Sequence, residues 1–444
     1  MQIDKTTLLD LNIFSQSGED IATLIDHCST NIGREALRKH IRNPSETFEQ
    51  LQALQEVIHW WSAHEESWTK SISNGTIVLL EKFFDSADNE VDTPGAFNLL
   101  IGSFLQKLLN RNQYTFIQFS LTHLSDFLRG CSELCALLNG QSAALPTKLE
   151  SELHMMQKEL EHPLVPLLLA VNKNTPYNTL VRLSFRARRE LKNAVQRLLI
   201  HFARLDCWQG MAVATKTLGW HFPKLNDSKE IVLKSEGIFH PLLSKPIPYS
   251  VSFNQEQFFL LLTGANMSGK TTFMRALGVA ALLAHLGMGV PAKAMEISFL
   301  QGIITNMHVE DNLLLGESYF FAEVKRMKST AQKISGEEPH LVLMDELFKG
   351  TNVHDAYECT SAVVEGLLGH KNHIMILSTH IHEVAHHFEK RTELLFSYFE
   401  TTMGADGSFQ FTYQLKEGIS NDRIGYRILV QEGVIELLQQ GKKS

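Results

Sequence analysis

One stretch of the sequence decides the fold: Thr263-Gly264-Ala265-Asn266-Met267-Ser268-Gly269-Lys270-Thr271-Thr272. It follows an apolar run at 258–262, which predicts a buried strand, and it precedes an Ala- and Leu-rich segment, which predicts a helix. A strand, the pattern Gly-x-x-x-x-Gly-Lys-Thr and a helix together form the context that a phosphate-binding loop requires. In such a loop, backbone N–H groups and the positive end of the helix dipole point at the bound anion. We therefore expect a phosphate-binding loop, with a chance glycine turn as the alternative.

Two side chains of this loop suit a bound nucleotide. The Lys270 amino group would reach the β and γ phosphates, and the Thr271 hydroxyl would ligate Mg²⁺. The stretch thus predicts a nucleotide bound together with a magnesium ion.

A second apolar run, 340–344, ends in two carboxylates, Asp345 and Glu346. A strand of this kind is buried on both faces, so its polar end should lie at the carboxyl edge of the sheet, beside the phosphate loop. There Asp345 would hold Mg²⁺, directly or through water, and Glu346 would orient and polarise the attacking water. The alternative is a strand that merely ends at a charged turn.

A third buried strand is predicted at 373–378, and it ends in Thr379 and His380. A histidine at that edge can donate a hydrogen bond to a γ-phosphate oxygen, although a lone histidine is more often structural. A glycine turn at 311–316 runs into a further helix. Its N-terminal amides and Ser318 could bind a phosphate, though not obviously one of their own subunit.

The length of 444 residues suggests about two to three domains. Residues 1–225 show helical periodicity, while strands and glycine turns follow from 226 to 444 in α/β alternation. We therefore expect a helical domain at 1–225 and an α/β domain at 226–444. Within the second, 394–399 and 409–415 predict a β-hairpin.

Composition limits the possible partners. Hydrophobic residues make up 44% and charged residues 20%, as in a soluble globular protein. The net charge of −8 gives no overall basic field, so any DNA contact must come from a local patch or an enclosing shape. The N-terminus has no signal-peptide pattern, and the longest apolar run, 276–291, is shorter than a membrane span. We expect a cytoplasmic protein without a membrane segment.

Five cysteines are scattered along the chain, and only Cys131 and Cys135 lie close together. No neighbouring Cys or His pair completes a metal site, so buried thiols in a reducing compartment are expected.

A basic segment precedes residue 198 and contains Arg182, Arg186, Arg188, Arg189, Lys192 and Arg197. Helical spacing places several of these cations on shared faces. They could form a phosphate-contacting surface. A solvated helix face with local acidic partners such as Glu190 is the favoured alternative.

The combined motifs closely resemble those of the MutS family of DNA mismatch repair ATPases. The Asn266-Met267 pair inside the phosphate loop is distinctive of that family among ABC-type ATPases. The strand ending at Asp345-Glu346 looks like its Walker B strand, and His380 looks like its switch histidine. The segment 311–323 is similar to its ABC signature segment. More weakly, 26–33 and Leu205-Asp206 look like parts of the family's helical core, or lever, domain.

The resemblance implies an ABC-type P-loop ATPase domain, preceded by a mostly α-helical lever domain, with ATP and Mg²⁺ as cofactors. It implies a homodimer in which Ser318 completes the ATP site of the other subunit and Asp355 is the D-loop aspartate. It places Ile247 and Tyr249 near the adenine. Double-stranded DNA and repair proteins are the partners that it implies.

The sequence departs from the family pattern in several places. We expect no mismatch-probing domain, because the only Phe-x-Glu, 321–323, lies in the signature segment and the chain begins almost directly at the core. A reduced clamp and no nuclease-like domain are also expected. The stretch 347–349 replaces a glycine-containing loop, and Tyr319 stands where Thr is usual. These departures count against mismatch recognition but leave the ATP site intact.

Three functions compete. The first is a DNA-binding ATPase, whose dimer closure is coupled to mismatch repair or related DNA processing. The second is an ATP-gated adaptor without direct mismatch recognition, which the net charge of −8 favours. A small-molecule kinase is the weakest, because it gives no reason for the signature segment or for a glutamate directly after Asp345.

Overall fold

The computed structural model describes residues 1–15, 19–85, 111–140, 144–172, 174–228, 230–307, 319–403, 409–420, 434 and 437–438. The chain divides into two compact units. The first comprises Met1–Leu24, Arg42–Gln52 and Thr217–Ser444, and the second comprises Ile25–Ile41 and Ala53–Lys216.

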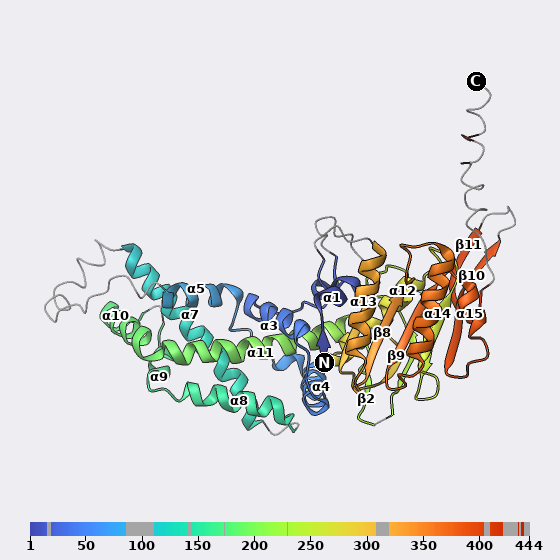
Figure 1. Cartoon of the computed structure of the whole chain (residues 1–444). Coiled ribbons are helices and arrows are strands. Elements are labelled where there is room, and N and C mark those ends of the chain that lie inside the picture. The colour runs from blue at the N-terminus through green and yellow to red at the C-terminus, as the bar shows by residue number, and fades with distance from the viewer. Residues whose placement is uncertain are drawn as a thin grey trace. The chain divides into compact units, whose positions relative to one another are not determined.

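A large sheet organises the first unit (Figure 1). Its strands in the described residues are β1 (Gln2–Ile3), β5 (Phe259–Thr263), β7 (Gly302–Asn306), β8 (His340–Asp345), β9 (Ile374–Thr379), β10 (Leu394–Met403) and β11 (Phe409–Glu417). They are ordered β1-β7-β8-β9-β5-β10-β11, and every neighbouring pair is parallel except β10 and β11. The carboxyl ends of β8, β9 and β5 therefore meet at one edge, as the apolar runs predicted.

A second sheet has the order β2-β6-β3-β4. Its strands are β2 (Lys224–Asn226), β3 (Leu233–Ile238), β4 (Tyr249–Phe253) and β6 (Ala294–Ser298). Helix α12 (Lys270–His285) contacts β3 of this sheet and β8 and β9 of the large one. Because α12 packs against both sheets, nearly all its residues are buried, which explains its apolar run at 276–284.

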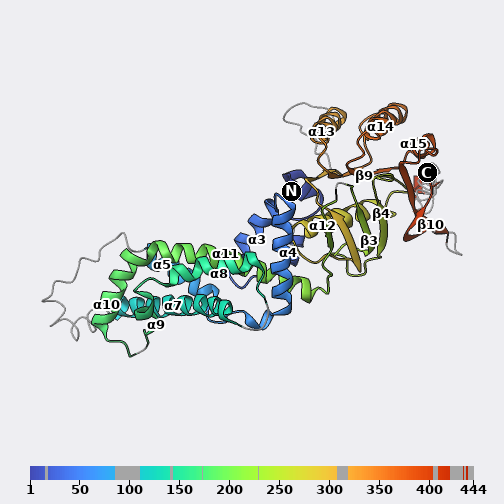
Figure 2. The same ribbon diagram turned by 90° about the horizontal axis from the view of Figure 1, so that it is seen from below.

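The other face of the large sheet carries α13 (Tyr319–Lys333) and α14 (Val353–Leu367), on the side opposite α12 (Figure 2). Helix α15 (His382–His387) contacts α14 and β5. With helices on both faces, β5, β7 and β9 are buried along their whole lengths.

The N-terminus belongs to this sheet. Strand β1 pairs with β7, Gln2 opposite Gly302, and α1 (Lys5–Asp10) contacts β7. The Asp4 side chain caps α1 by accepting from the Thr7 N–H at 2.8 Å. A short helix, α2 (Ile21–Leu24), follows.

The second unit is helical in its described residues. It contains α3 (Asn31–Arg42), most of α4 (Phe48–Ala63), η1 (Glu65–Ser67), α5 (Asn74–Asp85), α7 (Arg111–Cys135), η3 (Ala136–Asn139), α8 (Thr147–Leu160), α9 (Val165–Leu169), α10 (Tyr177–Arg186), the π-helical turn η4 (Ala187–Leu191) and α11 (Lys192–Thr217). Helix α7 contacts α5, α8, α9 and α10, so it is central to the packing. The fully buried rings of Phe127 and Phe202 lie edge to face, 6.0 Å apart.

Two segments far apart in sequence meet in this unit. Asp206 of α11 is fully buried and accepts from the backbone N–H groups of Ser29 and Thr30 at 2.8 and 2.9 Å. The Thr30 hydroxyl donates to the same carboxylate at 2.6 Å. A Cβ atom at Gly33 would lie 2.1 Å from Asp206 Oδ2, so only glycine fits there. The two weakly family-like patches of the N-terminal half are thus in contact.

The expected pairing of an α/β unit with a mostly helical one is confirmed, as is the β10–β11 hairpin. Strand β1 and helix α1 belong to the same compact unit as the large sheet. A two-residue strand is too short to show a strand periodicity in the sequence. The division at residue 225 stays a prediction.

Candidate functional site

The glycine loop connects β5 to α12 and adopts a backbone that few other residues would accept. Gly264 has φ 138° and Gly269 has φ 112°, and Met267 between them is also left-handed, with φ 68°. A Cβ atom at Gly264 would lie 3.2 Å from Ser268 Oγ. The two glycines therefore allow a tight turn directly at the carboxyl end of β5.

The start of α12 is suited to an anion. Gly269 is its N-cap, and no side chain caps the first N–H groups of the helix. The Ser268 hydroxyl is buried and has no hydrogen-bond partner within the described residues. Unpaired N–H groups, the positive helix end and a buried hydroxyl together form a cradle that phosphate oxygens would satisfy.

Lys270 is 4% exposed and crosses the loop. Its amino group donates to the carbonyl oxygens of Gly264 and Ala265 at 2.8 and 3.0 Å and lies 3.4 Å from Glu346 Oε1. Burial lowers the pKa of Lys270 even though Glu346 and Asp345 act to raise it. A phosphate bound in the loop would bring a further negative charge next to this buried amino group.

Thr271 and Asp345 meet across the site. The Thr271 hydroxyl donates to Asp345 Oδ2 at 2.7 Å, and the Ser378 hydroxyl donates to Asp345 Oδ1. A hydroxyl and a carboxylate are oxygen ligands that suit Mg²⁺, which usually keeps few protein ligands beside waters and phosphate oxygens. No group of three or more His, Cys, Asp or Glu side chains is arranged to hold a metal in the described ranges, so phosphate oxygens would have to complete such a site.

Glu346 lies close to two lysines and a histidine. Beside Lys270, the Lys349 amino group lies 3.2 Å from Glu346 Oε2, and His380 Nδ1 lies 3.6 Å from the same oxygen. Burial acts to raise the pKa of the Glu346 carboxyl, but His380, Lys270 and Lys349 outweigh burial and lower the pKa to about 2. Glu346 is therefore ionised at neutral pH.

Of the other predicted site residues, one lies outside the described residues and one has its partners elsewhere. Ser318 lies outside the described residues. Asp355 is exposed in the first turn of α14 and accepts from Asn352 Nδ2 at 2.6 Å and from the Thr351 hydroxyl at 3.3 Å. Its partners thus lie on its own turn.

Of the two residues that the resemblance places near the adenine, Ile247 is half-buried and Tyr249 is 6% exposed. The Tyr249 ring packs edge-on against Phe273 and Phe399 at 5.4 and 5.7 Å. Tyr249 therefore supports the loop from the core beside it.

Three further residues at the site were not predicted: Ser378, Lys349 and Tyr413. Ser378 and Lys349 adjoin predicted residues, so their nearness in sequence was the available signal. Tyr413 on β11 is 42% exposed and has φ 53°. A Cβ atom added at Gly269 would lie 3.4 Å from Tyr413 Cδ1. Only the pairing of β11 with β10, next to β5, brings Tyr413 to the loop.

The basic segment before residue 198 is partly neutralised. Arg186 makes a two-point ion pair with Glu190, and Arg197 makes one with Glu159. Arg188 and Arg189 lie over the Phe83 and Phe185 rings. These contacts support the solvated helix face that was favoured from the sequence.

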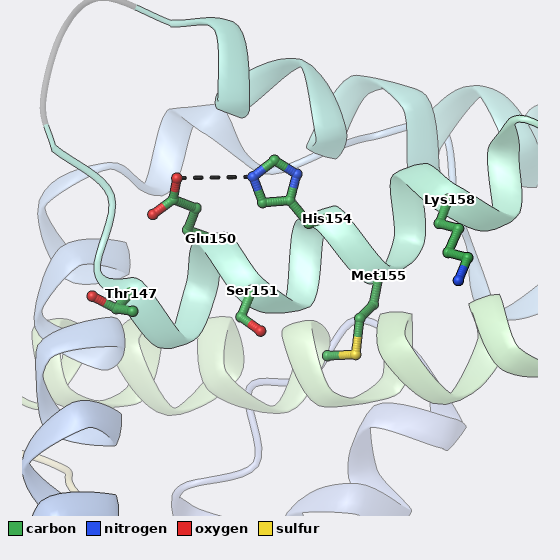
Figure 3. A pocket seen from close by; sticks show the side chains of 6 residues that line it. All are labelled: Thr147, Glu150, Ser151, His154, Met155 and Lys158. Carbon is green, nitrogen blue, oxygen red and sulfur yellow. Dashed lines mark ion pairs between the residues drawn. The ribbon is translucent and has the colours of Figure 1, made fainter.

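Two hollows in the described part of the helical unit contain none of the predicted nucleotide residues. One runs along α8, beside Thr147, Ser151 and Met155 (Figure 3). At this hollow His154 Nε2 lies 3.8 Å from Glu150 Oε1. A neighbouring hollow is lined by Lys148, Arg204 and Trp208, among others.

The cysteines are free thiols, and four of the five are buried, as expected; Cys359 is half-buried. In the part of the chain that the structure describes, no helix is both long enough and apolar enough to span a membrane.

A parallel sheet with a glycine loop, a helix N-terminus and acidic side chains at one carboxyl edge is the arrangement of nucleotide-binding α/β domains. Comparison with known proteins narrows this class. Residues 260–439 match the family model of MutS domain V, which is the ATPase domain of MutS.

Curated relatives include the DNA mismatch repair protein MutS of Streptococcus pyogenes serotype M49 (strain NZ131) and that of serotype M12 (strain MGAS2096). Each is 30% identical over 242 residues, which cover 53% of this chain and 28% of the relative. The chain thus spans under a third of the length of these relatives. Over residues 260–439, the chain is thus similar to domain V of MutS.

Proposed function

We propose that this chain hydrolyses ATP through an ABC-type P-loop domain and acts on double-stranded DNA as a homodimer. One observation carries the proposal: Lys270, Thr271, Asp345 and Glu346 gather at the ends of neighbouring parallel strands, within a region that matches MutS domain V. MutS-family proteins are ATPases, and the relatives are named for DNA mismatch repair.

In this proposal, residues Gly264–Thr272 cradle the phosphates, and Lys270 exchanges its contact with Glu346 for one with the β and γ phosphates. Thr271 and Asp345 hold Mg²⁺, which would neutralise charge on the phosphate oxygens. Released from Lys270, the Glu346 carboxylate orients and polarises the attacking water. His380, on the neighbouring strand end, donates to a γ-phosphate oxygen.

The dimer part of the proposal follows from the family resemblance. Ser318 of one subunit would complete the nucleotide site of the other, and Asp355 is exposed as a residue for such an interface must be. ATP would then favour the closed dimer because it binds that state better than the open one.

Replacing Glu346 with Gln tests hydrolysis and closure together. We expect Glu346→Gln to lower the ATPase rate at least about a hundredfold, the usual range for a lost general base, while ATP binding persists. Light scattering should then find an ATP-bound dimer. Glu358→Gln, an exposed carboxylate of α14, is the matched control and should behave as wild type. A Glu346→Gln chain that stays monomeric with ATP would contradict the sandwich dimer.

DNA binding is tested separately by measuring ATPase activity and binding with duplex, mismatched and branched DNA at increasing salt. Affinity should be highest at low salt, because phosphate neutralisation releases counterions. No binding even at low salt, with ATPase activity intact, would instead favour the ATP-gated adaptor.

A further inference from the structure

Glu323 of α13 is 6% exposed, and its carboxylate is tied to the loop after Glu346. Oε1 accepts from the Lys349 backbone N–H at 3.1 Å, and Oε2 accepts from the Gly350 N–H at 3.2 Å. Both carboxylate oxygens thus hold successive amides of one loop, and hydrogen bonds to an ionised acceptor are stronger than neutral ones.

The packing around these bonds is close. A Cβ atom at Gly350 would lie 2.8 Å from both the Phe320 backbone nitrogen and Tyr319 Cδ1. The Phe348 side chain is 4% exposed, and its ring lies 5.9 Å from that of Phe320. The first turn of α13 and the loop after Glu346 therefore have little freedom to separate.

The loop itself has an unfavourable backbone. Glu346 has φ 52° and Phe348 has φ 62°, and such left-handed residues cost on the order of 1–3 kcal/mol each unless their surroundings hold them. On one side the Glu346 N–H donates to the Ser378 carbonyl oxygen at 3.0 Å. On the other side, the Glu323 carboxylate holds the amides of residues 349 and 350, which adjoin Phe348.

We propose that Glu323 is a positioning residue that fixes the Glu346 carboxylate from helix α13. The inference rests on the proposed function, because it assumes that Glu346 acts in ATP hydrolysis. Glu323 reaches Glu346 through the backbone of 349–350 and through Lys349, whose amino group contacts Glu346 Oε2. A shift of α13 would therefore move the carboxylate that orients water without removing the phosphate cradle.

The test replaces Glu323 with Gln, which keeps one acceptor oxygen and turns an NH₂ donor toward a backbone N–H. We expect kcat to fall about 10- to 100-fold, since a misplacement of about 1 Å can cost a hundredfold. The Kd for ATP should stay within about twofold of wild type. Glu337→Gln, an exposed carboxylate after α13, is the matched control. An equal loss in binding and turnover would mean a merely structural role and would overturn the inference.

A double-mutant comparison identifies the residue through which Glu323 acts. In single-turnover assays, adding Glu323→Gln to Glu346→Gln should lower the residual rate less than about twofold, since the positioned group is already gone. A full multiplicative loss would contradict the positioning role. If Glu323→Gln does not fold, Glu323→Asp and Gly350→Ala replace it in the test. Each should lower kcat while the Kd for ATP stays close to that of wild type.

The two proposals fail in different ways. A wild-type chain without ATPase activity overturns the proposed function. A wild-type chain that hydrolyses ATP, loses activity in Glu346→Gln and keeps it in Glu323→Gln overturns only the positioning role.

Discussion

At the scale of single residues, Glu346 lies within 3.4 Å of the amino groups of Lys270 and Lys349 and 3.6 Å from His380 Nδ1. Its carboxyl has a pKa of about 2, below the ordinary 4.5, because the hydrogen bond from His380 and the charges of Lys270 and Lys349 outweigh the effect of burial. The folded chain thus binds fewer protons at this group than the unfolded chain does. Its stabilising contribution is present above pH 4.5 and is lost as the pH falls toward 2.

Glu346→Gln should therefore lower the thermal midpoint of the nucleotide-free protein at pH 7. The shift in pKa corresponds to on the order of 3 kcal/mol, at about 1.4 kcal/mol per unit. The difference from wild type should narrow as the pH is lowered from 5 toward 3, and calorimetry at several pH values measures it. A difference that does not change with pH would show that the cations do not stabilise the ionised form.

Tyr413 is a residue for which a role follows from structure alone. It is half-exposed beside Gly269, and burial together with the neighbouring Tyr413 raises the pKa of Tyr249. A left-handed backbone is uncommon for so bulky a residue. We therefore expect this exposed ring beside the phosphate loop to stack on the base of a bound nucleotide.

We predict that Tyr413→Ala weakens ATP binding by about 5- to 100-fold, because stacking of a base on an aromatic ring is worth about 1–3 kcal/mol. Tyr413→Phe keeps the ring and should bind within about twofold of wild type. Titration with a fluorescent ATP analogue measures both. Equal affinities for the Ala and Phe variants would show that the ring does not contact the base.

The predicted residues and Tyr413 differ in how they could be found. Lys270, Asp345 and Glu346 follow buried strands or a glycine loop, and parallel strands bring such ends to one sheet edge. Tyr413 lies on an antiparallel strand outside that pattern, and its position depends on the register of β11 with β10. A register of this kind is set by tertiary packing, which one sequence does not display.

At the scale of elements, the N-terminal segment is attached to the large sheet by a buried charge. Asp10 at the end of α1 is 4% exposed and accepts from Arg326 Nη2 and from the Thr305 hydroxyl, both at 2.7 Å. The Met307 N–H also donates to Asp10, at 3.2 Å. A single carboxylate thus joins α1, β7 and α13.

Asp10→Ala should destabilise the protein by about 3–5 kcal/mol, because it breaks the buried ion pair between the Asp10 carboxylate and Arg326. Lys333→Ala breaks the exposed Asp4–Lys333 pair of the same segment and should cost less than about 1 kcal/mol. Thermal unfolding compares the two variants. Similar small losses in both would mean that Asp10 does not hold the segment.

Whether a segment forms a helix or a strand was largely predictable from the sequence. Which helices and strands pack against one another was not. The apolar periodicity of the long helices and the strand–loop–helix pattern at 258–285 determine those elements locally. The pairing of β1 with β7 and the contact between Asp206 and Thr30 join residues 176 or more positions apart. Which residues meet depends on how their side chains fit together, as Gly33 leaves room for the Asp206 carboxylate. A local sequence pattern does not predict such contacts.

For the whole molecule, each of the two units has buried side chains of its own, so we expect each to unfold in its own transition. The nucleotide residues all belong to one unit, while Asp206 and Gly33 belong to the other. A ligand stabilises only the folded unit that binds it. Nucleotide binding and a helical-unit mutation should therefore act on different transitions.

Calorimetry of the full chain should show two transitions. A hydrolysis-resistant ATP analogue with Mg²⁺, at about 100 times its Kd, should raise only one by about 5–10 °C, because it adds about 2.7 kcal/mol to that unit. Lys270→Ala should abolish this rise. Gly33→Ala should lower only the other transition, since the added methyl group would overlap the Asp206 carboxylate, whereas Gly366→Ala meets open space. A single transition that responds to both changes would show that the units unfold as one cooperative body.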